Sequence, residues 1–152
     1  MKYALLLSFG LLFVFACNEP SPQIEEGPSF SLSEQAAELY QIVGEKHDTA
    51  MLLTKNIENV QHSLRSKLET IKSSTPEKDS LLDLLTALKK ADDSMMDWMH
   101  EFKNTDLNEA EYQAMSEQEI LTYLREEEAK IEQVHVDMLS SIANGKHFLR
   151  RN

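Results

Sequence analysis

The residues best suited to binding chemistry gather in one short block, which runs from Met95 to Phe102 and reads MMDWMHEF. The block holds three methionines, one histidine and the only tryptophan of the chain. Thioethers and imidazoles are soft or borderline ligands that suit Cu(I), and a tryptophan face can add cation–π attraction to a bound ion. The block therefore indicates a candidate metal site.

Helical spacing extends this candidate site to a second segment. His47 and Met51 lie four residues apart and so share one face of a helix, as do Met95 and Met99. In a helical hairpin that turns at 74–75, residues whose numbers sum to about 149 lie at one level, so His47 faces the level of Phe102. The predicted metal ligands are His47, Met51, Met95, Met99 and His100.

Two other interpretations of the same residues stay open. Methionine fills irregular cores and contacts aromatic rings favourably, so we favour core packing over a metal site. His47 would then bond to an acid on a neighbouring helix, and Lys46 beside it would extend outward or pair with an acid. A haem-like cofactor with His and Met axial ligands is a further alternative, without a CxxCH motif to support it.

Composition narrows the classes of function. The 152 residues carry 15 Lys and Arg against 26 Asp and Glu, a formal charge of −11. This excess of acid disfavours a nucleic-acid groove, which needs clustered cations. One cysteine rules out an intramolecular disulfide, a CxxC pair or a thiolate zinc site.

Catalytic motifs are not found, and we predict a protein that is not an enzyme. The sequence has no nucleophile motif, glycine-rich phosphate loop or HExxH. Glu126 to Glu128 indicates a solvated helix face, and Glu132 to His135 supplies only one of the Glu-x-x-His pairs that a di-iron bundle needs. His62 and His135 are expected at the surface or at the rim of the core.

Hydrophobic periodicity predicts three helices, at about 32–73, 76–103 and 117–149. The starts carry cap signals, namely Ser31 to Glu34, Thr75 before Pro76, and Ser116 to Glu119. Gly145 is expected to weaken the third helix. The predicted buried positions are Ala36, Val43, Ala50, Ile57, Leu64, Ile71, Leu39, Leu53, Val60, Leu81, Leu88, Met95, Phe102, Leu84, Ala91, Trp98, Leu85, Met99, Leu124, Ile131, Met138, Ile120, Leu121, Val134 and Ile142.

These elements predict an all-α domain over 31–152, an antiparallel up-down-up three-helix bundle with coiled-coil-like packing. The first helix is about ten residues longer than the second, so segment 104–116 or a partner must cover its first turns. Within that segment, Leu107, Tyr112 and Met115 are expected to fold back onto the bundle. Heptad repeats also permit self-association, but we favour packing within one chain.

The N-terminal segment predicts the cellular location of the protein. Lys2 and the apolar run from Tyr3 to Ala16 are typical of a signal peptide over 1–16 and are too short for a bilayer span. The letters VFAC that end at Cys17 resemble the lipobox of bacterial lipoproteins, which implies lipid on Cys17. Residues 17–30 are rich in proline and acid and form a flexible tether. Asn18 after the cysteine favours the outer membrane and leaves the face open.

Together with this lipobox, three blocks resemble a family of small helical outer-membrane lipoproteins from Bacteroidota, often labelled viral A-type inclusion protein. The blocks are HDxxM at His47 to Met51, MMDWMHxF at Met95 to Phe102, and the helix around Tyr123 to Val134. The resemblance implies a cellular location and a fold, and it implies no activity. We therefore predict a lipid-anchored binding or structural module of the cell envelope, without a resident cofactor. The alternatives are a periplasmic Cu(I)-binding protein and an adaptor that pairs with another helical envelope protein.

Overall fold

The computed structural model describes residues 30–72 and 75–151, and it contains helices and no strand in these ranges. The prediction of an all-α protein is thus confirmed for this part of the chain. The predicted signal peptide, the lipidation site Cys17, nearly all of the tether and the turn at 73–74 lie outside the described residues. The helices are α1 (Glu34–Met51), α2 (Thr54–Thr70), α3 (Pro76–Glu101), α4 (Glu109–Ala114) and α5 (Glu117–Arg151).

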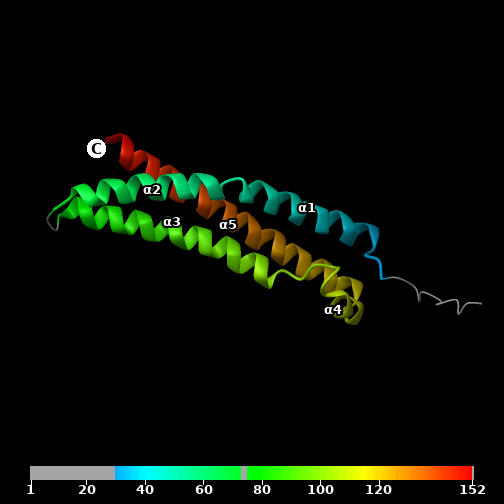
Figure 1. Ribbon diagram of the computed structural model, residues 1–152. Coiled ribbons are helices and arrows are strands. Elements are labelled where there is room, and N and C mark those ends of the chain that lie inside the picture. The colour runs from blue at the N-terminus through cyan, green and yellow to red at the C-terminus, as the bar shows by residue number, and fades with distance from the viewer. Residues whose placement is uncertain (1–29, 73–74, 152) are drawn as a thin grey trace, which may run out of the picture.

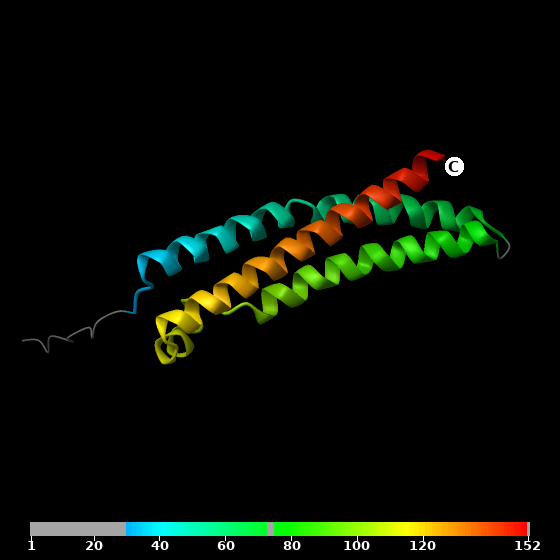
Figure 2. The ribbon, with the colours of Figure 1, turned by 180° about the vertical axis from the view of Figure 1, so that it is seen from behind.

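The helices form one elongated body (Figure 1). α2 continues from the end of α1, and α3 lies beside α2. α5 runs along the length of the molecule and packs on α1, α2 and α3, as both views show (Figure 2). α4 and the first turns of α1 and α5 lie at one end, and the C-terminus lies at the other, where α2 meets α3.

The apolar positions expected from the periodicity form the core. Most are buried, and the rest, such as Leu39, Leu53 and Ile71, are half-buried against it. The larger cluster extends along α1, α2, α3 and α5. Because these apolar residues recur every three or four positions, each helix presents one continuous stripe to its neighbours.

A second, smaller cluster covers the first turns of α1. It joins Ala36 of α1 to Tyr112 of α4 and Leu124 of α5, with Phe30 and Met115 packed against it. The segment after α3 therefore performs the covering role that the length mismatch requires. The prediction for Leu107 is wrong: this side chain is 84% exposed. It lies in a turn held by the Asn104 side chain, which accepts from the Leu107 amide at 2.8 Å.

The first predicted helix, 32–73, is divided in two at Leu52 and Leu53, which is a correction to the single helix expected. The amide of Leu53 donates to the carbonyl of Ala50, three residues back, at 2.9 Å, so the chain tightens locally. A heptad stripe on a regular α-helix drifts by about 20° per repeat. A tighter turn offsets this drift, so that Val43 and Ile57 on the two sides of the break stay in the same core.

The helices begin at the predicted cap residues, except that the cap of α1 lies two residues later than predicted. Thr75 Oγ1 accepts from the Lys78 amide at 3.3 Å, and Pro76 occupies the first turn. The Ser116 amide donates to the Glu119 carboxylate at 2.8 Å, as a capping box requires. At α1 the cap is Ser33 and not Ser31, because Ser33 Oγ accepts from the Ala36 amide.

Gly145 has a packing role that the sequence did not indicate. It is buried in α5, and a Cβ there would lie 2.5 Å from Cγ1 of Val60 on α2. Real Cβ contacts are not this short, so the glycine allows α5 and α2 to approach closely. α5 continues past Gly145 to Arg151.

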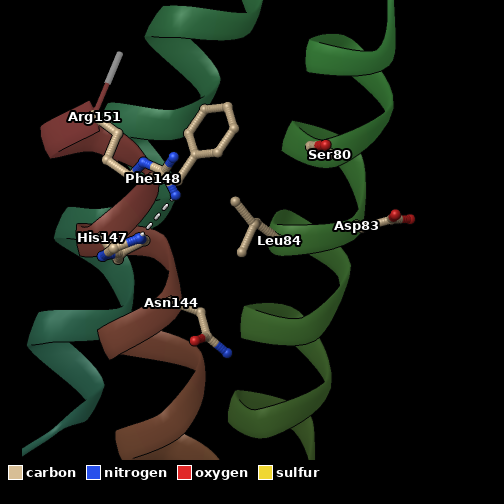
Figure 3. A pocket seen from close by; sticks show the side chains of 7 residues that line it. All are labelled: Ser80, Asp83, Leu84, Asn144, His147, Phe148 and Arg151. Carbon is tan, nitrogen blue, oxygen red and sulfur yellow. Dashed lines mark hydrogen bonds between the residues drawn. The ribbon is translucent and has the colours of Figure 1, made fainter.

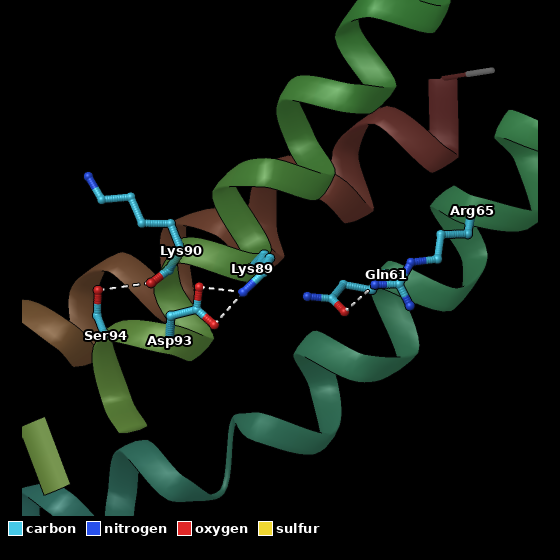
Figure 4. A network of polar contacts seen from close by, with 6 residues as sticks. All are labelled: Gln61, Arg65, Lys89, Lys90, Asp93 and Ser94. Carbon is cyan, nitrogen blue, oxygen red and sulfur yellow. Dashed lines mark hydrogen bonds and ion pairs between the residues drawn. The ribbon is translucent and has the colours of Figure 1, made fainter. Parts of the chain in front are cut away.

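The outer faces carry short-range polar pairs, as expected for solvated helices. Lys89 and Asp93 pair at 2.6 Å on α3, and Arg65 donates to Gln61 at 3.2 Å on α2 (Figure 4). Such exposed pairs contribute about 0.3–0.5 kcal/mol each. Across residues 30–72 and 75–151, no helix is long and apolar enough to cross a membrane.

Candidate site: an aromatic pocket between α1 and α3

A pocket of about 200 Å³ lies between α1 and α3. These two helices do not pack closely at the backbone level, because α5 is the main neighbour of each in this half of the molecule. Side chains bridge the gap instead. The residues that line the pocket are Tyr40, Gly44 and His47 from α1, Trp98 and Met99 from α3, and Phe102 at its C-terminal end.

Four rings form the walls of this pocket. The imidazole of His47 stacks on Trp98, with ring centroids 5.6 Å apart. Trp98 stacks on Phe102 at 4.9 Å, and Phe102 contacts the ring of Tyr40 at 5.7 Å. Ring pairs at these separations are favourable beyond the area they bury. The stacked rings therefore hold α1 and α3 at a fixed spacing without filling the space between them.

Trp98 has an unusual polar environment. The residue is 7% exposed, and its Nε1 is the single buried side-chain N or O atom in the described ranges that has no hydrogen-bond partner. An unsatisfied buried donor costs about 1–3 kcal/mol, so native proteins rarely keep one. The indole N–H is thus enclosed by its neighbours and has no acceptor among the described residues.

Gly44 keeps the pocket open on the α1 side. It lies in the interior of the helix, where glycine costs about 1 kcal/mol relative to alanine. A Cβ at Gly44 would meet nothing within 4 Å, so close packing does not require the glycine. This contrasts with Gly145, where a neighbouring side chain occupies the space. The absence of a side chain at Gly44 leaves free volume beside His47 and Trp98.

His47 is held by its own helix. Its Nδ1 lies 2.9 Å from the carboxylate of Asp48, so the expected partner on a neighbouring helix is wrong. Lys46 pairs across to α5 as predicted, with Glu132 at 2.5 Å and Glu128 at 3.5 Å. The hydrogen bond from Lys46 holds the pKa of the Glu132 carboxyl below its ordinary value.

The structure brings two of the five predicted metal ligands to this pocket, His47 and Met99. Met95 is buried within the core and Met51 packs partly buried against it. His100 is exposed on the outer face of α3. The level of His47 is that of Trp98 instead of Phe102, one helical turn from the expected register. In the described ranges, no group of three or more His, Cys, Asp or Glu side chains could hold a metal ion.

Sequence reasoning missed Tyr40 and Gly44 as site residues. Tyr40, Gly44 and His47 follow one another at intervals of four and three, which places them on one face of α1. This spacing was the available signal. The pattern of apolar residues did not reveal it, because a tyrosine, a glycine and a histidine have little weight in a hydrophobic periodicity.

Glu127 departs from the prediction of a solvated acidic run. It is 3% exposed, and its carboxylate pairs with Lys130 at 2.8 Å. Glu127 lies three residues after Leu124 and four before Ile131, so helical spacing places it on the buried face. The other two acids of the run, Glu126 and Glu128, are exposed or half-buried as expected.

Buried tyrosines fix the chain after α3, next to the pocket. The Lys103 amide donates to the Tyr123 hydroxyl at 2.7 Å, and the Tyr112 hydroxyl donates to the Lys103 carbonyl at 2.8 Å. Burial raises the pKa of Tyr123 to about 12 and raises the pKa of Tyr112 further. Both hydroxyls are therefore neutral hydrogen-bonding groups that hold the segment following Phe102.

A larger groove of about 580 Å³ lies near the C-terminus between α3 and α5. Leu84 and Phe148 face each other across it, while Asp83 points away (Figure 3). Arg151 lies 3.5 Å from the His147 ring. The polar side chains at this groove are exposed, in contrast to the rings that wall the pocket between α1 and α3.

Comparison of the chain with protein-family models, with curated proteins and with solved structures found no match.

Proposed function

We propose that this chain is a non-catalytic module of the bacterial cell envelope that binds a small molecule in the pocket between α1 and α3. The observation that carries the proposal is a pocket walled by four stacked or tilted rings and kept open by Gly44. The groups that line this pocket are rings, a thioether and a helix backbone. They suit binding, and they do not pair a nucleophile with a base.

In this proposal the helical body is an antiparallel up-down-up three-helix bundle. Its first member is α1 with α2, its second is α3, and its third is α5. The N-terminal segment delivers the chain to the outer membrane as a lipoprotein of the Bacteroidota type, with lipid on Cys17 and residues 18–30 as a tether. Replacing Cys17 with alanine is expected to move the protein from the membrane to the soluble fraction; a variant that still sediments with membranes contradicts the anchor.

The binding proposal is tested on the full-length lipidated chain in lipid nanodiscs, with ¹³C-labelled methionine methyl groups. Met99 lines the pocket, whereas Met96 three residues earlier is 46% exposed on the outer face and serves as an internal control. Adding naphthalene or quinoline is expected to shift the Met99 methyl signal saturably and to leave the Met96 signal unchanged.

A matched pair of variants separates binding in the pocket from binding elsewhere. Gly44→Leu places a side chain in the free volume and should abolish the Met99 shift. Ala37→Leu adds the same side chain at an exposed position of α1 and should preserve the shift. Equal shifts in both variants, or no saturable shift in the unmodified chain, contradict the proposal.

A second candidate function is Cu(I) binding, favoured by the placement of His47 and Met99 on one pocket with the ring of Trp98. Under reducing, anaerobic conditions, Cu(I) should quench Trp98 fluorescence at a one-to-one ratio. His47→Ala and Met99→Ala should abolish the quenching, whereas Met96→Ala should not. Quenching that is equal in all three variants, or absent from the unmodified chain, rejects this candidate.

A further inference from the structure

We propose that the groove between α3 and α5 near the C-terminus is a second binding site, whose ligand is a monocarboxylate with an apolar body. This site is separate from the pocket between α1 and α3 and does not depend on binding there. Three features of the described residues support it: the apolar walls, an unpaired guanidinium, and the charge of this half of the molecule.

The apolar walls give the groove room for the body of a ligand. Leu84 of α3 and Phe148 of α5 are half-buried and face each other across it (Figure 3). The groove has a volume of about 580 Å³. Pockets for drug-sized ligands occupy roughly 300–1,000 Å³, so a body of one or two fused rings fits between these side chains.

The α5 side of the groove carries polar side chains on one helix face. Asn144, His147, Phe148 and Arg151 occupy positions i, i+3, i+4 and i+7, which share a face of α5. Where a helix packs closely on its neighbour, this spacing carries apolar residues. Here it presents an amide and a guanidinium, both of which donate hydrogen bonds to carboxylates.

Arg151 is the residue that selects an anion. Within residues 30–72 and 75–151 it forms no ion pair, and its Nη1 lies 3.5 Å from Nε2 of His147. Asp83, the acid among the residues that line the groove, points away from it (Figure 3). A planar guanidinium matches the two oxygens of a carboxylate. The groove thus places a cation without a counter-charge beside an apolar wall.

The charge of this half of the molecule also favours an anion. Residues 54–72, 75–93 and 138–151 carry ten Lys and Arg against seven Asp and Glu, whereas residues 30–53 and 94–137 carry four against sixteen. An anionic ligand is therefore attracted to the end that holds the groove and repelled from the end that holds the pocket between α1 and α3. Because one guanidinium lines the groove, a single carboxylate is the matching group.

The experiment uses the full-length lipidated chain in nanodiscs of zwitterionic lipid, with ¹³C-labelled leucine methyl groups. Leu84 lines the groove, whereas Leu82 is 44% exposed, does not line it and serves as an internal control. Three probes share one frame at neutral pH: naphthalene-2-carboxylate is negative, naphthalene-2-carboxamide is uncharged, and naphthalen-2-ylmethylammonium is positive. The carboxylate should shift the Leu84 signals saturably and leave the Leu82 signals unchanged. It should bind about fivefold more tightly than the amide, and the ammonium should bind most weakly.

A matched pair of arginine variants tests the role of Arg151. Arg151→Gln removes the guanidinium that lines the groove and should lower the affinity for the carboxylate to that for the amide. Arg150→Gln removes the same charge from a neighbour that does not line the groove, and it should change this affinity by less than about twofold, since salt screens exposed charges. The amide should bind both variants as it binds the unmodified chain.

Each contrary outcome rejects a separate step. If the amide or the ammonium binds the unmodified chain as tightly as the carboxylate, the preference for an anion is wrong. If both arginine variants weaken binding equally, Arg151 does not select the ligand. If none of the three probes shifts the Leu84 signals, the groove is not a binding site, and a Met99 shift from the same probes would leave the function proposed above standing.

Discussion

The two helix glycines provide a sharp test of the packing, since the same substitution should have opposite effects at the two positions. At Gly44 a methyl group enters open space, whereas at Gly145 it meets Val60 at 2.5 Å. Gly44→Ala should therefore stabilise the protein by about 1 kcal/mol, the difference in helix propensity. Because the pocket remains large enough after one methyl group is added, this variant should also keep its ligand.

For Gly145→Ala the same propensity gain of about 1 kcal/mol is opposed by overpacking of about 1–3 kcal/mol. Val60 cannot rotate away easily, since a β-branched side chain in a helix has one strongly preferred rotamer. Leu64 and Leu88, at 3.5 Å and 3.6 Å from the new Cβ, close the remaining space. We expect a net loss of about 1 kcal/mol.

The assay is urea unfolding followed by far-ultraviolet circular dichroism, with Val60→Ala and the double variant completing the cycle. Val60→Ala alone should cost about 2 kcal/mol by leaving a small cavity. In the double variant the methyl group at position 145 enters that cavity, so the combined loss should fall short of the sum by 1 kcal/mol or more, roughly. Strictly additive losses, or stabilisation by Gly145→Ala equal to that by Gly44→Ala, would refute the close approach of α2 and α5.

Three further predictions concern individual polar groups. Burial raises the pKa of Tyr112 in the folded protein, whereas the unfolded value is about 10. As the pH rises above about 10, this residue should therefore lower the free energy of unfolding by about 1.4 kcal/mol per pH unit. Tyr112→Phe should show a shallower alkaline decline of stability in denaturation experiments. Ser116→Ala should cost about 1 kcal/mol in thermal unfolding by removing the α5 cap, and an unchanged melting temperature would contradict that role. Lys46→Met should change the free energy of unfolding by less than about 1 kcal/mol, because the pair with Glu132 is partly exposed. The stability of the variant should also depend less on salt concentration. A loss of several kcal/mol would show a stronger pair than this geometry supports.

The helices were predictable because their signals are local. The start of α3 is indicated by Thr75 with Pro76, and the start of α5 by Ser116 with Glu119. The spacing of the apolar residues predicts which helix faces are buried. The break at Leu52 was not predictable from the same signals. Neither residue at the break disfavours a helix, and the tightening compensates a drift that only a packed neighbour makes costly.

The site was predictable in part for the same reason. The spacing of His47, Trp98 and Met99 placed them near one level, but the register was off by about one turn. Because α2 ends at Thr70 and α3 begins at Pro76, residues at one level have numbers that sum to about 146 and not 149. Residue type could not reveal that Met95 enters the core while Met99, one turn later, lines a pocket. The roles of Gly44 and Gly145 depend on what lies opposite each glycine, which is tertiary information.

Ligand binding in the pocket between α1 and α3 is tested most directly through Trp98, whose ring forms part of the wall. Because the chain has one tryptophan, its indole N–H gives a single signal in a ¹⁵N–¹H correlation spectrum. Saturating naphthalene or quinoline should shift this signal, because a ligand ring beside the indole changes its local magnetic environment; Gly44→Leu should remove the shift and Ala37→Leu should preserve it. An indole signal that stays in place at saturating ligand, or that shifts equally in both variants, would contradict binding in this pocket.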